Sequence, residues 1–235
     1  MSRFRPAKPR AVLFDLDGTL IDSVPDITVS VAELMASCGL PSFSEHEVRG
    51  MVGYGVRVLV QRAFTARSME LEGERLELMV TRMMGIYRHH LVDKTVLMPG
   101  AEQALDALSE VGANLALVTN KPHSAAETIL EHFRLRSRFA LVLGDATPTV
   151  PATVRNKPHP DMLNYALAQL GTHPAEAVMV GDSPADMDSA AAAAVYSVAV
   201  RGGYAAIPVE DMGPNAIIDT LADLGGLFGG HLVHA

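Results

Sequence analysis

The sequence predicts an α/β protein with a Rossmann-like parallel sheet core, into which an α-helical segment is inserted. Three observations lead to this fold class. Short apolar runs alternate with amphipathic helical patterns between residues 101 and 200, as they do in βαβ units. These runs are unbroken, as expected for strands that are covered on both faces. Residues 22–95 carry helical periodicity only. We therefore expect an α/β core of residues 1–21 and 96–235 and an inserted helical domain of residues 22–95.

The elements follow from local patterns. Ser23 with Asp26, and Ser44 with Glu47, have the spacing of capping boxes, so each pair is expected to begin a helix. Cys38 falls on the apolar stripe of the first helix and is interpreted as a packing residue. The remaining predicted helices are 56–64, 76–91, 101–111, 124–132, 160–170 and 185–194, and the predicted strands are 11–14, 114–118, 140–143, 177–180 and 196–200. Glycines from Gly225 to Gly230 predict a poorly specified C-terminus.

Composition narrows the function classes. The 235 residues are 49% apolar and carry a net charge of −8. No basic stripe is present, so nucleic acid is not an expected partner. The single cysteine precludes an internal disulfide, which suits a reducing compartment. The longest apolar run, residues 190–200, is too short to span a bilayer, and no signal-peptide pattern precedes the first strand. We expect a cytoplasmic protein, monomeric or homodimeric, with no membrane partner.

The first strand ends in Asp15-Leu16-Asp17-Gly18. Residues i and i+2 of an extended chain point the same way, so Asp15 and Asp17 are expected to lie on one side. Two like charges repel each other unless a cation lies nearby. Oxygen ligands favour magnesium or calcium, so this pair predicts a divalent metal site. The alternative interpretation is a strand followed by an ordinary Asp-rich turn.

Other polar side chains also follow predicted strands, and ligands of open α/β sheets bind at the carboxyl ends of the strands. They are Thr119, Asn120, Lys157, Asp182 and Asp186. Taken singly, each has a structural alternative, such as a turn residue, a solvated loop lysine or a helix cap. Gathered at one edge, they match magnesium-assisted phosphoryl transfer. Asp15 would then attack phosphorus, Asp17 would act as general acid and base, and Thr119 and Lys157 would contact the phosphoryl group.

Four segments resemble the four motifs of the haloacid dehalogenase-like hydrolase superfamily. They are Asp15–Leu20, Thr119-Asn120, Lys157–Pro160 and Gly181–Asp186. The resemblance implies an aspartyl-phosphate intermediate on Asp15 and a core Mg²⁺. Its ligands would be Asp15, Asp182 and the backbone carbonyl of Asp17, with Asp186 a ligand or an orienting residue. The helical insertion resembles the first type of cap in that superfamily. One departure is Ala194, where members often have glycine in a turn.

Asp17 favours phosphate esters over haloacids as substrates. The alkoxide that leaves a phosphate ester must be protonated, whereas a halide leaving group needs no proton, and the dehalogenase branch of the superfamily lacks this second aspartate. The segments 53–60 and Val118–Pro122 resemble those of bacterial phosphoglycolate phosphatases. A small substrate that carries a carboxylate, such as 2-phosphoglycolate, would meet cationic contacts from Arg57 or Lys121. Gly18 and Asn120 complete the expected phosphate-binding set.

Three alternatives stay open from the sequence. The first is a sister enzyme, either a phosphatase of sugar phosphates, nucleotides or pyrophosphate, or a phosphoglucomutase-like transferase. The second is a phospho-accepting switch like a response-regulator receiver domain, which also gathers Asp, Thr and Lys at strand ends. The third is a binding scaffold without catalysis. The Asp-x-Asp pair after the first strand and the long insertion argue against the receiver alternative.

Overall fold

The computed structural model describes residues 5–228. Its centre is a six-stranded parallel sheet in the order β5-β4-β1-β6-β7-β8. The strands are β1 (Ala11–Phe14), β4 (Asn114–Pro122), β5 (Leu141–Asp145), β6 (Ala177–Gly181), β7 (Tyr196–Val200) and β8 (Ala216–Ile218). The predicted α/β fold class is confirmed, and the most apolar strand, β1, lies inside the sheet with every residue buried.

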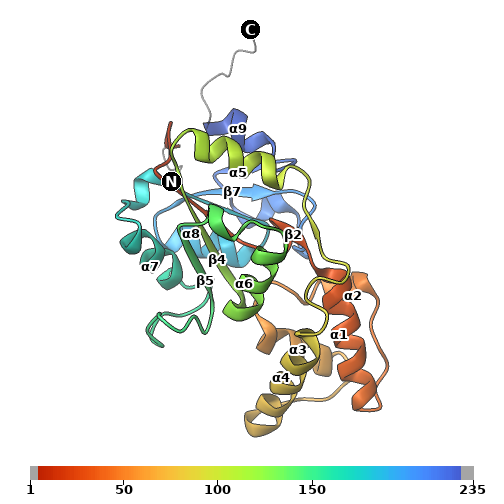
Figure 1. The fold of residues 1–235 in the computed structure, drawn as a ribbon. Coiled ribbons are helices and arrows are strands. Elements are labelled where there is room, and N and C mark those ends of the chain that lie inside the picture. The colour runs from red at the N-terminus through yellow and green to blue at the C-terminus, as the bar shows by residue number, and fades with distance from the viewer. Residues whose placement is uncertain (1–4, 229–235) are drawn as a thin grey trace.

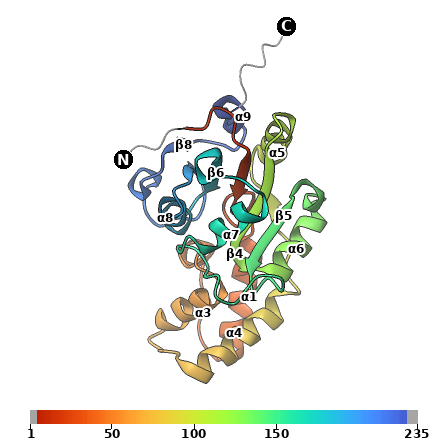
Figure 2. The same ribbon diagram turned by 90° about the vertical axis from the view of Figure 1, so that its left-hand side faces the viewer.

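Helices cover both faces of the sheet because successive strand residues point to opposite sides. Val12 and Phe14 belong to the cluster that includes helices α5 (Ala101–Glu110), α6 (His123–His132) and α9 (Asp223–Phe228). Ala11 and Leu13 pack instead with α7 (Asp161–Gln169) and α8 (Pro184–Ala192). Figure 2 shows α5 and α6 on one side of the sheet and α8 on the other.

Four helices lie between β1 and α5 in the chain and project from one end of the sheet (Figure 1). They are α1 (Val24–Ser37), α2 (Glu45–Arg49), α3 (Val56–Thr65) and α4 (Gly73–Tyr87). A two-stranded antiparallel sheet, β2 (Ile21–Asp22) with β3 (Val96–Leu97), brackets them. These two strands were not predicted, since two residues show no periodicity. Short 3₁₀ turns complete the fold at Arg136–Arg138, Pro174–Glu176 and Val209–Met212.

The two expected capping boxes have different outcomes. Ser44 and Glu47 form the predicted box at the start of α2. The box expected from Ser23 and Asp26 is absent, because both side chains bind elsewhere. Ser23 donates to Asp17, whereas buried Asp26 accepts hydrogen bonds from Lys94 N, Thr95 N and Thr95 Oγ1. Asp26 therefore ties the start of α1 to the segment that returns to the core.

Other expectations need smaller corrections. Strand β4 continues past Val118 to Pro122 with an irregular register, so Thr119 and Asn120 lie within it. Strand β8 was missed because it has only three residues. The C-terminal prediction is wrong for Gly225 and Gly226, which lie in α9 together with buried Leu224 and Phe228; Gly229 and Gly230 lie outside the described residues. Cys38 packs against the main apolar cluster, as predicted. In the described residues, no helix is long and apolar enough to cross a membrane.

Candidate active site

Lys157 joins two carboxylates at the carboxyl end of the sheet. Asp15 follows β1, and its backbone N–H donates to Val180 O at 3.0 Å. The Lys157 ammonium donates to Asp15 Oδ1 at 2.7 Å, Asp186 Oδ1 at 2.6 Å and Val118 O at 2.6 Å. Burial opposes the charge on Lys157, but the two carboxylates outweigh burial and raise the pKa of the lysine. All three ammonium protons are therefore in use, and the lysine is held charged.

Three buried carboxylates face one another around this lysine. Oxygens of Asp15, Asp182 and Asp186 all lie within 4.8 Å of one another. Burial raises the pKa of Asp15 to about 6, although Lys157 lowers it. Burial, followed by the charge of Asp186, raises the pKa of Asp182 well above its usual range. Three negative charges against one positive charge leave a buried excess that a divalent cation would compensate. The donor set, all carboxylate oxygen, fits Mg²⁺.

Each of the two carboxylates after β6 is fixed by hydrogen bonds. Asp182 accepts from Thr19 Oγ1 at 3.0 Å and from Tyr204 N at 2.6 Å. Asp186 Oδ2 accepts from the backbone N–H and the hydroxyl of Ser183, as the third residue of a capping box on α8. All four oxygens of Asp182 and Asp186 thus have protein partners, which fixes both carboxylates beside Asp15.

Gly18 lets the turn after β1 approach Asp182. Its φ is +84°, and a Cβ at this position would lie 2.3 Å from Oδ2 of Asp182. Any larger residue would displace the carboxylate. The predicted site function of Gly18 is therefore explained by space and backbone conformation, since only glycine adopts this φ freely.

Asp17 is held by residues from two other segments. Lys121 Nζ donates to its two carboxylate oxygens at 2.8 and 3.0 Å, and Ser23 Oγ donates at 2.5 Å. Burial opposes the charge on Lys121, but Asp17 outweighs it and raises the pKa of the lysine. The Lys121 ammonium also lies 4.8 Å from the centre of the Tyr87 ring.

Thr119 and Asn120 are both buried at the irregular end of β4. The Asn120 amide donates to Gly53 O at 3.1 Å and to Lys157 O at 2.9 Å. It thereby connects the sheet, the loop before α3 and the Lys157 loop. Thr119 lines the same cavity as Asp15, within reach of a group bound there.

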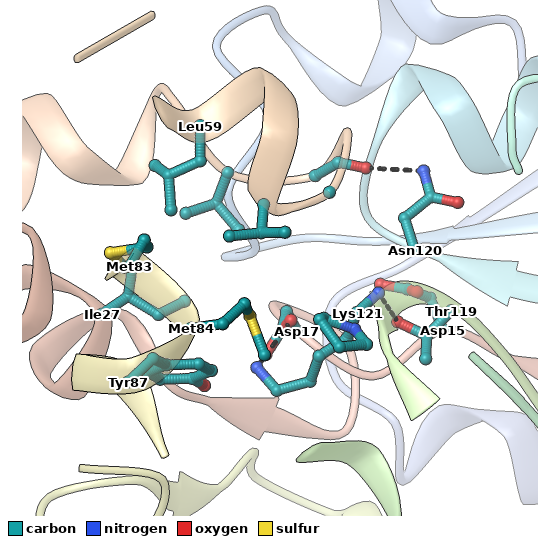
Figure 3. A pocket seen from close by; sticks show the side chains of 15 residues that line it. Asp15, Asp17, Ile27, Leu59, Met83, Met84, Tyr87, Thr119, Asn120 and Lys121 are labelled. Carbon is teal, nitrogen blue, oxygen red and sulfur yellow. Dashed lines mark hydrogen bonds and ion pairs between the residues drawn. The ribbon is translucent and has the colours of Figure 1, made fainter. Parts of the chain in front are cut away.

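A cavity of about 50 Å³ lies between the sheet edge and the helices α1, α3 and α4 (Figure 3). The core contributes polar side chains to it, namely Asp15, Asp17, Thr119, Asn120 and Lys121. The helical segment contributes mainly apolar ones, namely Ile27, Val52, Val56, Leu59, Met83 and Met84, together with Tyr87. The chemistry-bearing groups and the apolar groups therefore meet across one small space.

Arg57 is the predicted site residue that the structure places away from both this cavity and the carboxylate cluster. It is exposed on α3 and pairs with Glu77 of α4. The Gly-rich segment before α3 does reach the cavity, through Gly53 and Gly55. Arg57 is the second residue of α3, and its side chain points away from the cavity toward Glu77. Tyr87, in contrast, falls within the predicted helix 76–91 and was not predicted to belong to the site; its hydroxyl is the polar feature that could have marked it.

Comparisons with known proteins agree with this architecture. A family model described as haloacid dehalogenase-like hydrolase matches residues 12–200. "Phosphoglycolate phosphatase 1" of Pseudomonas aeruginosa is 38% identical over 227 residues, covering 94% of this chain and 80% of the relative. A phosphoglycolate phosphatase of Rhodospirillum rubrum is 36% identical over 225 residues, covering 94% of this chain and 91% of the relative.

Solved structures give the same picture. The crystal structure of a predicted phosphoglycolate phosphatase from Haemophilus somnus superimposes with a TM-score of 0.84 at 32% identity. That match covers 92% of this chain and 96% of the other. The resemblance stated from the four motifs is confirmed over nearly the whole length. The chain belongs to the haloacid dehalogenase-like hydrolases.

Proposed function

We propose that the protein is a magnesium-dependent phosphatase that hydrolyses a small phosphate monoester carrying a carboxylate, with 2-phosphoglycolate as the preferred substrate. The observation that carries this proposal is the cavity that Asp15 and Asp17 share with Lys121 and Thr119. Relatives named phosphoglycolate phosphatase at 33–38% identity support the substrate class.

The chemistry assigns one carboxylate to each task. An Asp15 oxygen attacks phosphorus, the ester P–O bond breaks, and Asp17 gives its proton to the departing alkoxide. Asp17 then takes a proton from water as that water attacks the aspartyl phosphate, which releases phosphate and restores Asp15. Thr119 donates to a phosphoryl oxygen, and Lys157 keeps Asp15 and Asp186 in position. Asn120 orients the Lys157 loop.

Mg²⁺ would be held by Asp15, Asp182 and the backbone carbonyl of Asp17, with Asp186 beside them, and would supply positive charge to the nucleophile and the phosphoryl group. The carboxylate excess described above supports this assignment. We propose residues 22–95 as the cap domain, whose helices close the cavity from water.

The lining of the cavity favours a small acid over the sister substrates. A volume of about 50 Å³ accommodates only a few water molecules, at roughly 10–15 Å³ each, so even 2-phosphoglycolate requires the helices α1, α3 and α4 to move outward. Nucleotides and sugar phosphates would require a larger movement. Sugar hydroxyls would also face Ile27, Leu59 and Met83, which offer no hydrogen bonds.

A substrate panel tests the proposal. Phosphate release would be measured from 2-phosphoglycolate, glucose 6-phosphate, AMP and p-nitrophenyl phosphate, with magnesium and with a chelator. We expect the highest kcat/KM for 2-phosphoglycolate, loss of turnover with chelator, and loss in Asp15→Asn. Asp188→Asn, exposed on α8, is the matched control and should keep full activity. Turnover that survives Asp15→Asn would refute the covalent route, and phosphate transfer to a second sugar would favour a mutase.

A further inference from the structure

The Tyr87 hydroxyl is a buried polar group without a partner. Tyr87 ends α4, its side chain is 4% exposed, and its hydroxyl makes no hydrogen bond with any described residue. Buried hydroxyl groups nearly always have a hydrogen-bond partner, so an unpaired one needs an explanation. Because this residue lines the cavity beside Asp17 and Lys121, a bound ligand can supply the missing partner.

The neighbouring Lys121 has a donor to spare. An ammonium carries three N–H groups. Two of them are used by its contacts to Asp17, and the third faces the Tyr87 hydroxyl and lowers the pKa of Tyr87 without forming a hydrogen bond of normal geometry. The ammonium lies 4.8 Å from the centre of the Tyr87 ring, and Figure 3 shows the two polar ends on the same side of the cavity. One N–H and one O–H are thus available next to each other.

The rest of this wall offers a ligand no polar side chain. The cap helices present Ile27, Leu59, Met83 and Met84 around Tyr87. Resting on the proposed phosphatase function, we infer that Tyr87 and Lys121 together bind the carboxylate of the leaving group, one donor to each carboxylate oxygen. Tyr87 is then the specificity-determining residue that the cap contributes.

The protonation of Tyr87 agrees with this role. Burial raises the pKa of Tyr87 to about 12, although Lys121 lowers it. The phenol therefore keeps its proton at neutral pH and donates to an anion. The short distance from this donor pair to Asp17 also limits the leaving group to a few atoms. A phosphate ester without a carboxylate would leave both donors unpaired, so it is bound less tightly.

The test compares two non-hydrolysable ligands in wild-type protein and Tyr87→Phe. The ligands are 3-phosphonopropionate, which carries a carboxylate, and propylphosphonate, which does not. Dissociation constants would be measured by calorimetry with magnesium chloride present. We expect wild-type protein to prefer 3-phosphonopropionate, and Tyr87→Phe to weaken that ligand about tenfold or more while leaving propylphosphonate unchanged. The same split should appear in KM for 2-phosphoglycolate against ethyl phosphate.

Met84→Leu is the matched control, because it changes an apolar neighbour on the same helix. It should affect both ligands equally. Equal weakening of both ligands by Tyr87→Phe, or no wild-type preference between them, would overturn the inference, even if 2-phosphoglycolate is hydrolysed. Preferential binding that Tyr87→Phe abolishes, in a protein without phosphatase turnover, would support the carboxylate site and refute the proposed function.

Discussion

The side-chain amide of Asn120 donates a hydrogen bond to the backbone carbonyl of Gly53 at 3.1 Å. This bond spans 67 residues of sequence and joins the end of β4 to the loop before α3. It holds the apolar helices against the edge of the sheet where Asp15 lies, so the closed shape of the cavity depends on a core residue that has no part in bond breaking.

Asn120→Ala should loosen this closure. It removes the bonds to Gly53 and to Lys157, and each buried bond contributes about 1 kcal/mol. We expect a lower urea midpoint, a higher KM for every substrate and a lower kcat, measured by denaturation and steady-state kinetics. Asn114→Ala, at the exposed start of the same strand, is the control and should leave the urea midpoint, KM and kcat unchanged. An unchanged KM in Asn120→Ala would contradict the closure.

Asp17→Asn should separate the two chemical steps. With p-nitrophenyl phosphate, a leaving group that needs no proton, Asp15 can still accept the phosphoryl group. Water attack then lacks its base, so steady turnover should fall by about 10²–10⁴. Stopped-flow absorbance should show a burst of p-nitrophenol close to one per site. Asp15→Asn should show no burst, and a burst-free Asp17→Asn with normal turnover would remove Asp17 from the mechanism.

Magnesium should stabilise the wild-type protein through the carboxylate cluster. A ligand at one hundred times its dissociation constant stabilises the folded state by about 2.7 kcal/mol. Scanning calorimetry should show a higher Tm with magnesium chloride than with chelator. Asp182→Asn should lose this increase, and with chelator it should be at least as stable as wild type, because one buried like charge is gone. An equal magnesium effect in both proteins would place the metal elsewhere.

Ala194→Gly should stabilise the fold. Ala194 has a φ of +58° in the turn between α8 and β7. A left-handed backbone conformation costs a non-glycine residue about 1–2 kcal/mol, which the glycine variant would recover. Glycine also raises the entropy of the unfolded chain, which offsets about 0.5–1 kcal/mol of this stabilisation. We expect a net gain of about 0.5–1 kcal/mol in the free energy of unfolding. Ala191→Gly, inside α8, should instead lower it; a loss in both variants would contradict the strain.

His90 should make the stability of the helical segment 22–95 depend on pH. Its ring bonds Asp93 at 3.0 Å and Glu33 at 2.9 Å, and the Asp93 bond, followed by Glu33, raises its pKa. A raised folded pKa gives stability that is complete below the unfolded value of about 6.5 and is lost as pH rises through the folded value. The Tm difference between wild type and His90→Gln should therefore be larger near pH 5.5 than near pH 8.5, roughly one to two units either side of that value. His89→Gln, its exposed neighbour, should show no such change.

Much of the core could be predicted because most of its strands are unbroken apolar runs. Asp15, Asp182 and Lys157 follow strands that the periodicity identifies, and parallel topology brings strand ends together. Side-chain partners were harder. Ser23 has the spacing of a cap, yet its hydroxyl binds Asp17 instead, in the turn between β1 and β2.

The side of the site that the helices α1, α3 and α4 form was the least predictable part. Val56 and Arg57 are adjacent in sequence, but a helix rotates by about 100° per residue. Val56 therefore faces the cavity, whereas Arg57 faces Glu77. Tyr87 lies on the same helix face as its apolar neighbours, so its spacing predicts only a packing residue. Its position beside Lys121 and its unpaired hydroxyl are visible only in the folded structure. Sequence spacing gives the face of a helix, whereas the partner across the cavity comes from the fold.

The pairing of Ile21 with Leu97 brings the departing and returning chain together as neighbours. Because Ile21 and Leu97 are adjacent, a short turn could join them in place of the helical segment, at a small cost in loop-closure entropy. The parallel sheet would stay intact. Such a trimmed enzyme would expose Asp15 to bulk water and to bulky esters alike. Substrate selectivity and hydrolysis thus depend on separate parts of the chain. Recombination at the β2–β3 junction can therefore exchange the helices that select the substrate and leave the hydrolytic residues unchanged.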